Sequence, residues 1–188
     1  VITINGGVVT VNAGAGQEGD GIDSNGWIVI NDGFIVTAAN ATSPDSGVDS
    51  DNGIYINGGT VLASGNMYDE VSNDSEQAFV VLSFADSIEA GQMFALKNAD
   101  GDIITAFSAA NDFQTLVYSS SELTDGDYTL YEISSAEGTE VSGHYTEVTS
   151  IEDETQLQYA SKNAGGFGGK GGAPMGGQAP NGQEGEAP

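Results

Sequence analysis

The sequence predicts an all-β protein, in which a parallel β-helix of about 26 residues per coil is followed by a small antiparallel sheet or sandwich and a glycine-rich tail. Three observations carry this prediction. Short segments recur at a fixed spacing of 26 residues, apolar and polar residues alternate within each copy, and a second group of strand-like segments lacks the repeat. Alternation with a period of two indicates strands and not helices.

The repeat is clearest where Ile4–Gly7 returns as Ile30–Gly33 and again as Ile56–Gly59, without insertion. Gly21–Asn25 returns as Gly47–Asp51 at the same offset. One copy cannot bury such short strands, but stacking each strand on its equivalent, about 4.8 Å away, buries the apolar residues as columns. The expected columns are Ile2/Ile28/Ile54, Ile4/Ile30/Ile56, Val9/Ile35/Val61 and Ile22/Val48.

Asparagine forms a further column at Asn5, Asn31 and Asn57. Stacked side-chain amides can hydrogen-bond from coil to coil, so we expect an asparagine ladder at the bend between strands. Asparagine and glycine are also generic turn residues. The identical register in three copies favours the ladder.

The chain divides into five segments by pattern and composition. We expect coils over residues 1–66, a linker over 67–77, a small antiparallel module over 78–133, a weak β extension over 134–160 and a disordered tail over 161–188. The module holds strand candidates at 79–84, 93–97, 103–107, 113–118 and 128–131, with an Asp-Gly hairpin signal between the second and the third. Such a module could cap the open edge of the coils. The tail composition cannot offset the entropy of ordering, and the tail is interpreted as a tether or as an inert terminus.

Composition excludes several classes of function. The 188 residues carry 28 acidic side chains against three lysines and no arginine, for a formal net charge of −25. Binding to nucleic acid or to an anionic membrane needs a basic surface that this chain lacks. Cysteine is absent, so disulfides and thiolate metal sites are excluded. No apolar run is long enough to predict a membrane-inserted helix.

The repeated bend is the best candidate site, because it brings hard oxygen ligands into one register. The repeat places Asp23 beside Asp49 and Asn25 beside Asp51, with Asp20 at the start of the bend. Like charges stacked about one strand spacing apart repel, and a cation with six to eight oxygen ligands relieves that repulsion. This ligand chemistry suits Ca²⁺ better than Zn²⁺ or copper. The alternative is a solvated turn in an acidic protein.

Catalysis is weighed as a minor alternative. Asp49 and Asp51 are the nominal acid and base for glycoside hydrolysis, but we expect nothing in an open bend to raise the pKa of an acid. The lone histidine, His144, is expected on the surface and outside any catalytic arrangement. We therefore predict a protein that is not an enzyme.

Two aromatic residues are the candidates for contact with sugar. Trp27 and Tyr55 flank the inward-facing Ile28, Ile54 and Ile56, so both should point outward near the bend. Aromatic faces bind sugar rings through apolar contact and hydrogen bonding. Covering the neighbouring coils is an equally good role for both rings.

The runs Asp20–Gly26, Ile30–Gly33 and Ile56–Ala63 resemble the carbohydrate-binding domain-containing proteins of anaerobic bacteria, and the resemblance extends over Ser75–Tyr131 and into the tail. It implies a right-handed parallel β-helix that contains calcium and binds cellulose and acidic pectic polymers such as polygalacturonate at the cell surface. Pectin-degrading enzymes are weighed as well, because parallel β-helices often host them. Their lyases use an arginine base, and this chain has no arginine.

The resulting expectation is a non-catalytic, calcium-supported module that binds plant cell-wall polysaccharide. We expect it to be secreted or held at the bacterial surface, with a signal peptide upstream of this chain. A structural or adhesive surface protein without glycan specificity is the second interpretation, and a pectin-active enzyme is the third.

Overall fold

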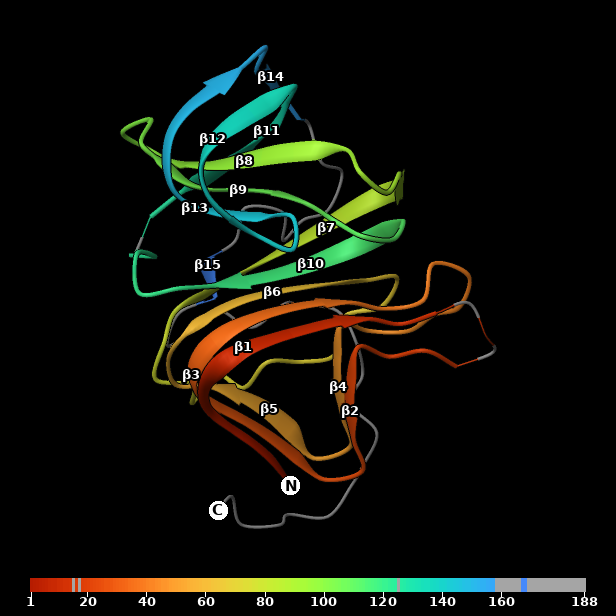
Figure 1. Cartoon of the computed structure of the whole chain (residues 1–188). Helices are drawn as coiled ribbons and strands as arrows, with labels where there is room; N and C mark the ends of the chain where they lie inside the picture. Colours follow the sequence, from red (N-terminus) through yellow and green to blue (C-terminus); the bar gives the residue numbers. More distant parts are fainter. Residues whose placement is uncertain (15, 17, 125, 158–166, 169–188) are drawn as a thin grey trace.

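The computed structural model describes residues 1–14, 16, 18–124, 126–157 and 167–168, and all the regular structure among them is β (Figure 1). The predicted all-β class is confirmed. No helix within these residues is long and apolar enough to cross a membrane. The tail expected to be disordered lies outside the described residues, apart from Phe167–Gly168.

The first part of the chain pairs in parallel at the spacing of the repeat. Its strands are β1 (Ile2–Asn12), β2 (Ile22–Ser24), β3 (Trp27–Ala38), β4 (Val48–Ser50), β5 (Gly53–Ile56) and β6 (Thr60–Gly65). β3 pairs with β1 on one side and with β5 and β6 on the other, while β2 and β4 form a small parallel sheet of their own. The pairs Ile2↔Ile28, Ile28↔Ile54 and Ile35↔Val61 are offset by 26 residues. The predicted columns are therefore confirmed.

Antiparallel strands complete the same sheet. β10 (Phe113–Ser119) pairs antiparallel with β6 on one side and with β7 (Phe79–Ile88) on the other, and β15 (Phe167–Gly168) pairs with β7. The sheet order is β1-β3-β6-β10-β7-β15, which makes this sheet mixed (Figure 1). Neither this sheet nor any other closes into a barrel among the described residues. A β-helix in the strict sense remains a proposal, taken up below.

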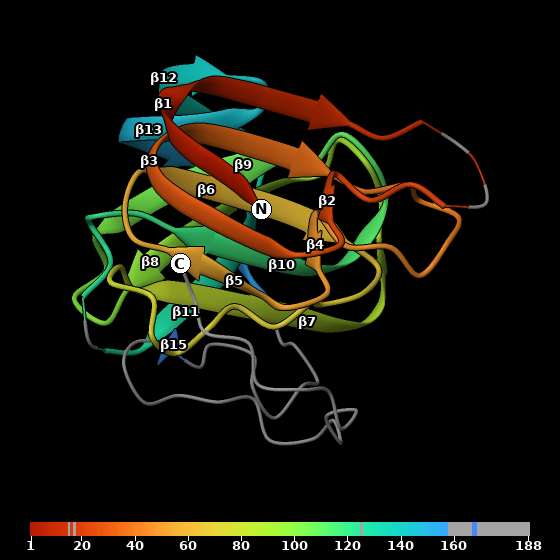
Figure 2. The same ribbon diagram turned by 90° about the horizontal axis from the view of Figure 1, so that it is seen from below.

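The second large sheet is antiparallel. It comprises β8 (Met93–Asn98), β9 (Ile103–Ser108), β11 (Tyr128–Ile133), β12 (Ser135–Val141), β13 (His144–Glu152) and β14 (Thr155–Gln156), in the order β12-β13-β9-β8-β11-β14. It lies beyond β7 and β10 from the parallel strands in Figure 1, and Figure 2 gives the view at right angles. Each of the five strand candidates predicted from the sequence falls within β7, β8, β9, β10 or β11.

Two main cores hold these layers together. The first is the interior of the repeat, where Ile28, Ile30, Ile54 and Ile56 are fully buried. The second lies between the two large sheets and includes the coil residues Val36 and Leu62 with residues of the antiparallel part: Val80, Leu82, Phe94, Leu96, Phe107, Leu116 and Leu130. The repeat and the antiparallel part therefore share a core.

His144 lies in this shared core, so the expectation that it lies on the surface is wrong. Its ring is fully buried, stacks on Phe34 of β3 at 4.9 Å and meets the ring of Tyr118 edge-on at 5.6 Å. Its Nε2 lies 2.8 Å from the Thr105 hydroxyl. Burial lowers the pKa of His144 to about 4. Its partners come from β3, β10 and β9, and no local sequence pattern reveals these contacts.

The asparagine ladder forms as predicted. Asn57 donates to Asn31 at 3.0 Å, and Asn31 donates to Asn5 at 2.8 Å. The segment expected as a linker, residues 67–77, packs along the coils. Val71 is buried and bridges Ile54, and the Ser75 hydroxyl accepts a hydrogen bond from the Ile56 amide.

Candidate functional site: an acidic bend and two aromatic rings

The bend is built by the close approach of two successive coils. Ile22 pairs with Val48 and Asp23 pairs with Asp49, as the repeat predicts. Gly21 makes the approach possible, because a Cβ at this position would lie 2.3 Å from the carbonyl oxygen of Gly47. Since Val48 is buried and side chains alternate along a strand, the aspartates of β2 and β4 lie on the outer face.

Asp49 is the electrostatic centre of the bend. Its pKa is raised to about 6, first by partial burial and then by the negative charges of the neighbouring aspartates Asp69, Asp20, Asp23 and Asp51. Each of these charges opposes ionisation of Asp49. The structure thus places three of the other predicted ligands, Asp20, Asp23 and Asp51, within electrostatic range of Asp49. It also corrects the expectation that nothing in the bend raises the pKa of an acid.

Asp20 and Asp69 are each fixed by a backbone donor of the coil that holds β4. Asp20 accepts a hydrogen bond from the Ser46 amide at 2.7 Å, and Asp69 accepts one from the Ser50 amide at 2.8 Å. Burial raises the pKa of both carboxyls, although these hydrogen bonds act in the opposite direction. Each aspartate keeps oxygen lone pairs beyond those the amides occupy.

Asp69 was not a candidate from the sequence. It lies in the segment expected as a linker, and only the folding of that segment along the coils places it beside Asp49. Its position directly before a second acidic residue, Glu70, was the available signal, and that signal is weak in a chain so rich in acid. Asn25, the remaining predicted ligand, is exposed directly after β2. Asp51, its equivalent one coil later, donates its backbone amide to the carbonyl oxygen of Ser24.

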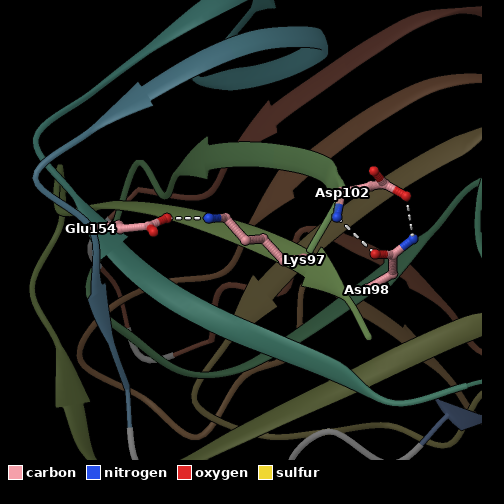
Figure 3. A network of polar contacts seen from close by, with 4 residues as sticks. All are labelled: Lys97, Asn98, Asp102 and Glu154. Carbon is pink, nitrogen blue, oxygen red and sulfur yellow. Dashed lines mark hydrogen bonds and ion pairs between the residues drawn. The ribbon is translucent and has the colours of Figure 1, made fainter. Parts of the chain in front are cut away.

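Positive charge lies elsewhere. Among the described residues, the ion pair joins Lys97 of β8 to Glu154, on the antiparallel sheet, and Lys97 also lies over the ring of Tyr131 (Figure 3). The same view shows Asn98 and Asp102 bonded to each other across the adjacent hairpin. The aspartates of the bend have no ion-pair partner among the described residues.

The donor atoms of the bend are of the type that calcium binds. They are carboxylate and amide oxygens, the hard ligands that Ca²⁺ takes in groups of six to eight. After partial burial, repulsion from the neighbouring carboxylates is the second cause of the raised pKa of Asp49, and a divalent cation would relieve that repulsion. Within the described residues, no group of three or more acidic, histidine or cysteine side chains already converges in the arrangement of a metal site.

The two predicted aromatic residues lie side by side. The rings of Trp27 and Tyr55 are 5.6 Å apart and tilted by 46°. The indole packs over Gly53, where a Cβ would lie 3.3 Å from a ring carbon, so the glycine leaves room for it. Both residues are half-buried and alternate with the fully buried Ile28 and Ile54. Their outward direction is therefore as predicted, and they form one continuous surface on adjacent strands.

The acidic bend and the aromatic pair are neighbours along the chain in both coils. Asp23 lies four residues before Trp27, and Asp51 lies four residues before Tyr55.

Comparison of the chain with protein-family models, with curated proteins and with solved structures gave no match.

Proposed function

We propose that the protein is a non-catalytic module that binds plant cell-wall polysaccharide, cellulose or acidic pectin, with the support of Ca²⁺. The proposal includes a right-handed parallel β-helix for residues 1–66. The parallel pairing at 26-residue spacing supports this, as does the strong preference of parallel crossovers for the right hand. It also includes a location outside the cell or at the bacterial surface.

The observation that carries the proposal is the contact between Trp27 and Tyr55 directly after the acidic bend. Two adjacent, partly exposed rings supply apolar surface for the CH groups of a sugar, and the tyrosine hydroxyl supplies a hydrogen bond. Strands stacked at a regular spacing suit an extended polymer, because successive sugars can contact successive coils. Uncharged cellulose would be held by these rings.

Calcium is assigned a second role, which is to permit binding of an acidic polymer. A chain with a net charge of −25 repels polygalacturonate at long range. An ion held at Asp49 by Asp23, Asp51 and the flanking Asp20 or Asp69 would neutralise part of the local negative charge. With open coordination positions, it would accept a carboxylate of the polymer directly.

The first test uses Trp27 as its own reporter, because it is the single tryptophan of the sequence. The full chain is titrated with cello-oligosaccharides while tryptophan emission is recorded, and retention on insoluble cellulose is measured in parallel. Tyr55→Ala and Trp27→Ala should each weaken retention about tenfold. The matched control is Tyr145→Ala, which removes a half-buried tyrosine on the other sheet. Unchanged retention of both folded variants would contradict the aromatic platform.

The second test separates calcium bridging from the aromatic contact. Mobility is measured in gels containing polygalacturonate, with calcium and with chelator. Asp49→Asn should abolish retardation and leave cellulose binding nearly intact, whereas Asp86→Asn, an exposed acid of β7, should change neither. Retardation that persists in excess chelator, with an unchanged circular dichroism spectrum, would refute the bridge.

The raised pKa of Asp49 favours one alternative, a pectin-active enzyme. A carboxyl that is half protonated near pH 6 can act as a general acid in glycoside hydrolysis. Assays for reducing ends and for unsaturated products, run on the same polymers at pH 5 to 7, detect that activity. A structural or adhesive protein without glycan specificity would bind neither polymer in either assay.

A further inference from the structure

The outer edge of β1 is the least complete part of the repeat. Among the described residues, β1 pairs with β3 on one side and with no strand on the other. Ile2 and Ile4 are only half-buried, whereas Ile28 and Ile30, their equivalents one coil later, are fully buried. Val8 is 65% exposed, whereas its equivalent Phe34 packs against the core between the two large sheets. Apolar positions that are covered one coil later are thus partly open at this level.

The asparagine ladder has a direction, and it ends at this edge as a donor. Asn57 donates its amide to Asn31, and Asn31 donates to Asn5. At the far end, the Asn57 Oδ1 accepts a hydrogen bond from the Glu76 amide at 3.3 Å. At the near end, Asn5 uses its oxygen for Asn31 and has no described partner for its own NH₂ group. A neighbour that completes the ladder must present an acceptor.

The backbone at this edge also leaves room for a close neighbour. A Cβ at Gly59 would lie 2.5 Å from the Gly33 carbonyl oxygen, and a Cβ at Gly33 would lie 3.0 Å from the Gly7 oxygen. These glycines let each coil approach the coil before it. Gly7 occupies the same position of the repeat, yet nothing lies within 4 Å of where its Cβ would be.

We propose that the edge of β1 docks one more coil of the same repeat, running parallel to β1. The contact continues the one that β1 makes with β3. The incoming strand would cover Ile2, Ile4 and Val9 with apolar residues at the equivalent positions. Its asparagine would accept the hydrogen bond that Asn5 can donate.

A second copy of the chain is a poorer occupant for two physical reasons. Two β1 edges that pair about a twofold axis perpendicular to the sheet run antiparallel, and an axis along the strands would turn their interior faces to opposite sides, whereas the coil contacts within the repeat are parallel and share one interior face. Twofold pairing would also set one Asn5 amide against another, donor against donor. The acceptor end of the ladder, at Asn57, is already used by Glu76.

The test adds a coil to the full chain. A copy of residues 27–52 is placed directly ahead of residue 1, which keeps the 26-residue register. A flexible Gly/Ser extension of equal length is the control, and a copy carrying Asn31→Ala isolates the ladder. Because stacked repeats gain stability from their nearest neighbours, the extended chain should melt about 5 °C or more above the Gly/Ser control. The Asn31→Ala copy should give a smaller rise.

Two further measurements test whether the rise in melting temperature arises at β1. Amide hydrogen exchange in β1 should slow by at least about tenfold, since an edge strand becomes a central one. Ile4→Ala should lower the melting temperature more in the extended chain than in the original. An unchanged melting temperature with unchanged exchange in β1 would overturn the proposal. So would a concentration-dependent dimer of the original chain that the added coil dissociates, because the edge would then serve a second copy.

Discussion

The repeat and the antiparallel part bury their side chains by different rules. In the repeat, a side chain packs on its own equivalent, as Ile28 does between Ile2 and Ile54. In the antiparallel part, unlike groups meet, as when Phe94 lies edge-on to Phe113 at 6.2 Å and His144 contacts Thr105. One spacing determines how the strands of successive coils pair in the first region, whereas each contact of the second must be specified separately.

This difference sets how each region responds to change. Glycine and asparagine columns in the repeat make the distance between coils the critical quantity. In the antiparallel part, single buried groups such as His144 are critical. The shared core, in which Val36 and Leu62 of the repeat contact residues of the second sheet, should nevertheless make the two regions unfold together.

The largest effects should come from the buried column. Ile30→Ala should lower the free energy of unfolding by about 4 kcal/mol, because Ile30 is fully buried. Leu96→Ala in the second sheet should cost about as much. Ile4→Ala, in the same column as Ile30 but half-buried, should cost about 1 kcal/mol. Urea titrations followed by tryptophan emission and by circular dichroism measure these values.

The same titrations test whether the regions are coupled. Trp27 reports on the repeat, and far-ultraviolet circular dichroism reports on both regions. Coincident transitions are expected for Ile30→Ala and for Leu96→Ala. A variant in which only the tryptophan transition moves would show that the regions unfold independently.

The second prediction concerns the spacing of the coils. Gly59→Ala should cost about 3 kcal/mol, since its φ is +83° and a Cβ would lie 2.5 Å from the Gly33 oxygen. Gly101→Ala is the matched control, with a φ of +89° but nothing within 4 Å of the new Cβ. It should cost about 1 to 2 kcal/mol, the strain alone. Equal losses would mean that close approach does not limit the repeat.

The fixed offset of 26 residues explains why the repeat could be predicted from the sequence. A residue at position n must lie beside residue n + 26 if the coils stack, so the columns, the asparagine ladder and the Asp23 to Asp49 pairing follow from the numbering alone. The outward direction of Trp27 and Tyr55 follows in the same way from their buried neighbours.

The antiparallel part could be predicted only as strands. Nothing local indicates that β10 inserts between β6 and β7 and thereby joins the second part to the repeat. His144 was misplaced because its partners Phe34, Thr105 and Tyr118 come from three strands far apart in sequence. Asp69 was missed for the same reason, since a contact across 20 residues without a repeat leaves no periodic signal.

The third prediction concerns how the stability of the antiparallel part depends on pH through His144. The pKa of His144 falls from 6.5 to about 4 on folding, so the unfolded state binds more protons between those values. This contribution to stability is complete above pH 6.5 and is lost as the pH falls toward 4, by up to about 3 kcal/mol. His144→Gln keeps a polar group for Thr105 but cannot titrate. Its stability should therefore fall less than that of the original chain between pH 6.5 and 4. Parallel pH profiles would rule out this role.

The last prediction concerns Asp49 in the repeat, where the change of stability with pH has the opposite sign to that of His144. The pKa of Asp49 rises from 3.8 to about 6 on folding, so the folded state binds more protons in that range. Stability should fall as the pH rises through it, because the ionised Asp49 is partly desolvated and also meets the charges of Asp69, Asp20, Asp23 and Asp51. In chelator, Asp49→Asn should therefore be more stable than the original chain above pH 6, and the difference should vanish below pH 4. We expect the gain in the free energy of unfolding to be under about 1 kcal/mol, since water screens a partly exposed charge.

Calcium should then stabilise the original chain more than the variant, because the ion replaces the same repulsion with attraction. Thermal melts at pH 4 and 7, with and without calcium, measure all four states. A variant that is less stable at pH 7 in chelator would show that Asp49 is held by favourable contacts instead of opposed by its neighbours.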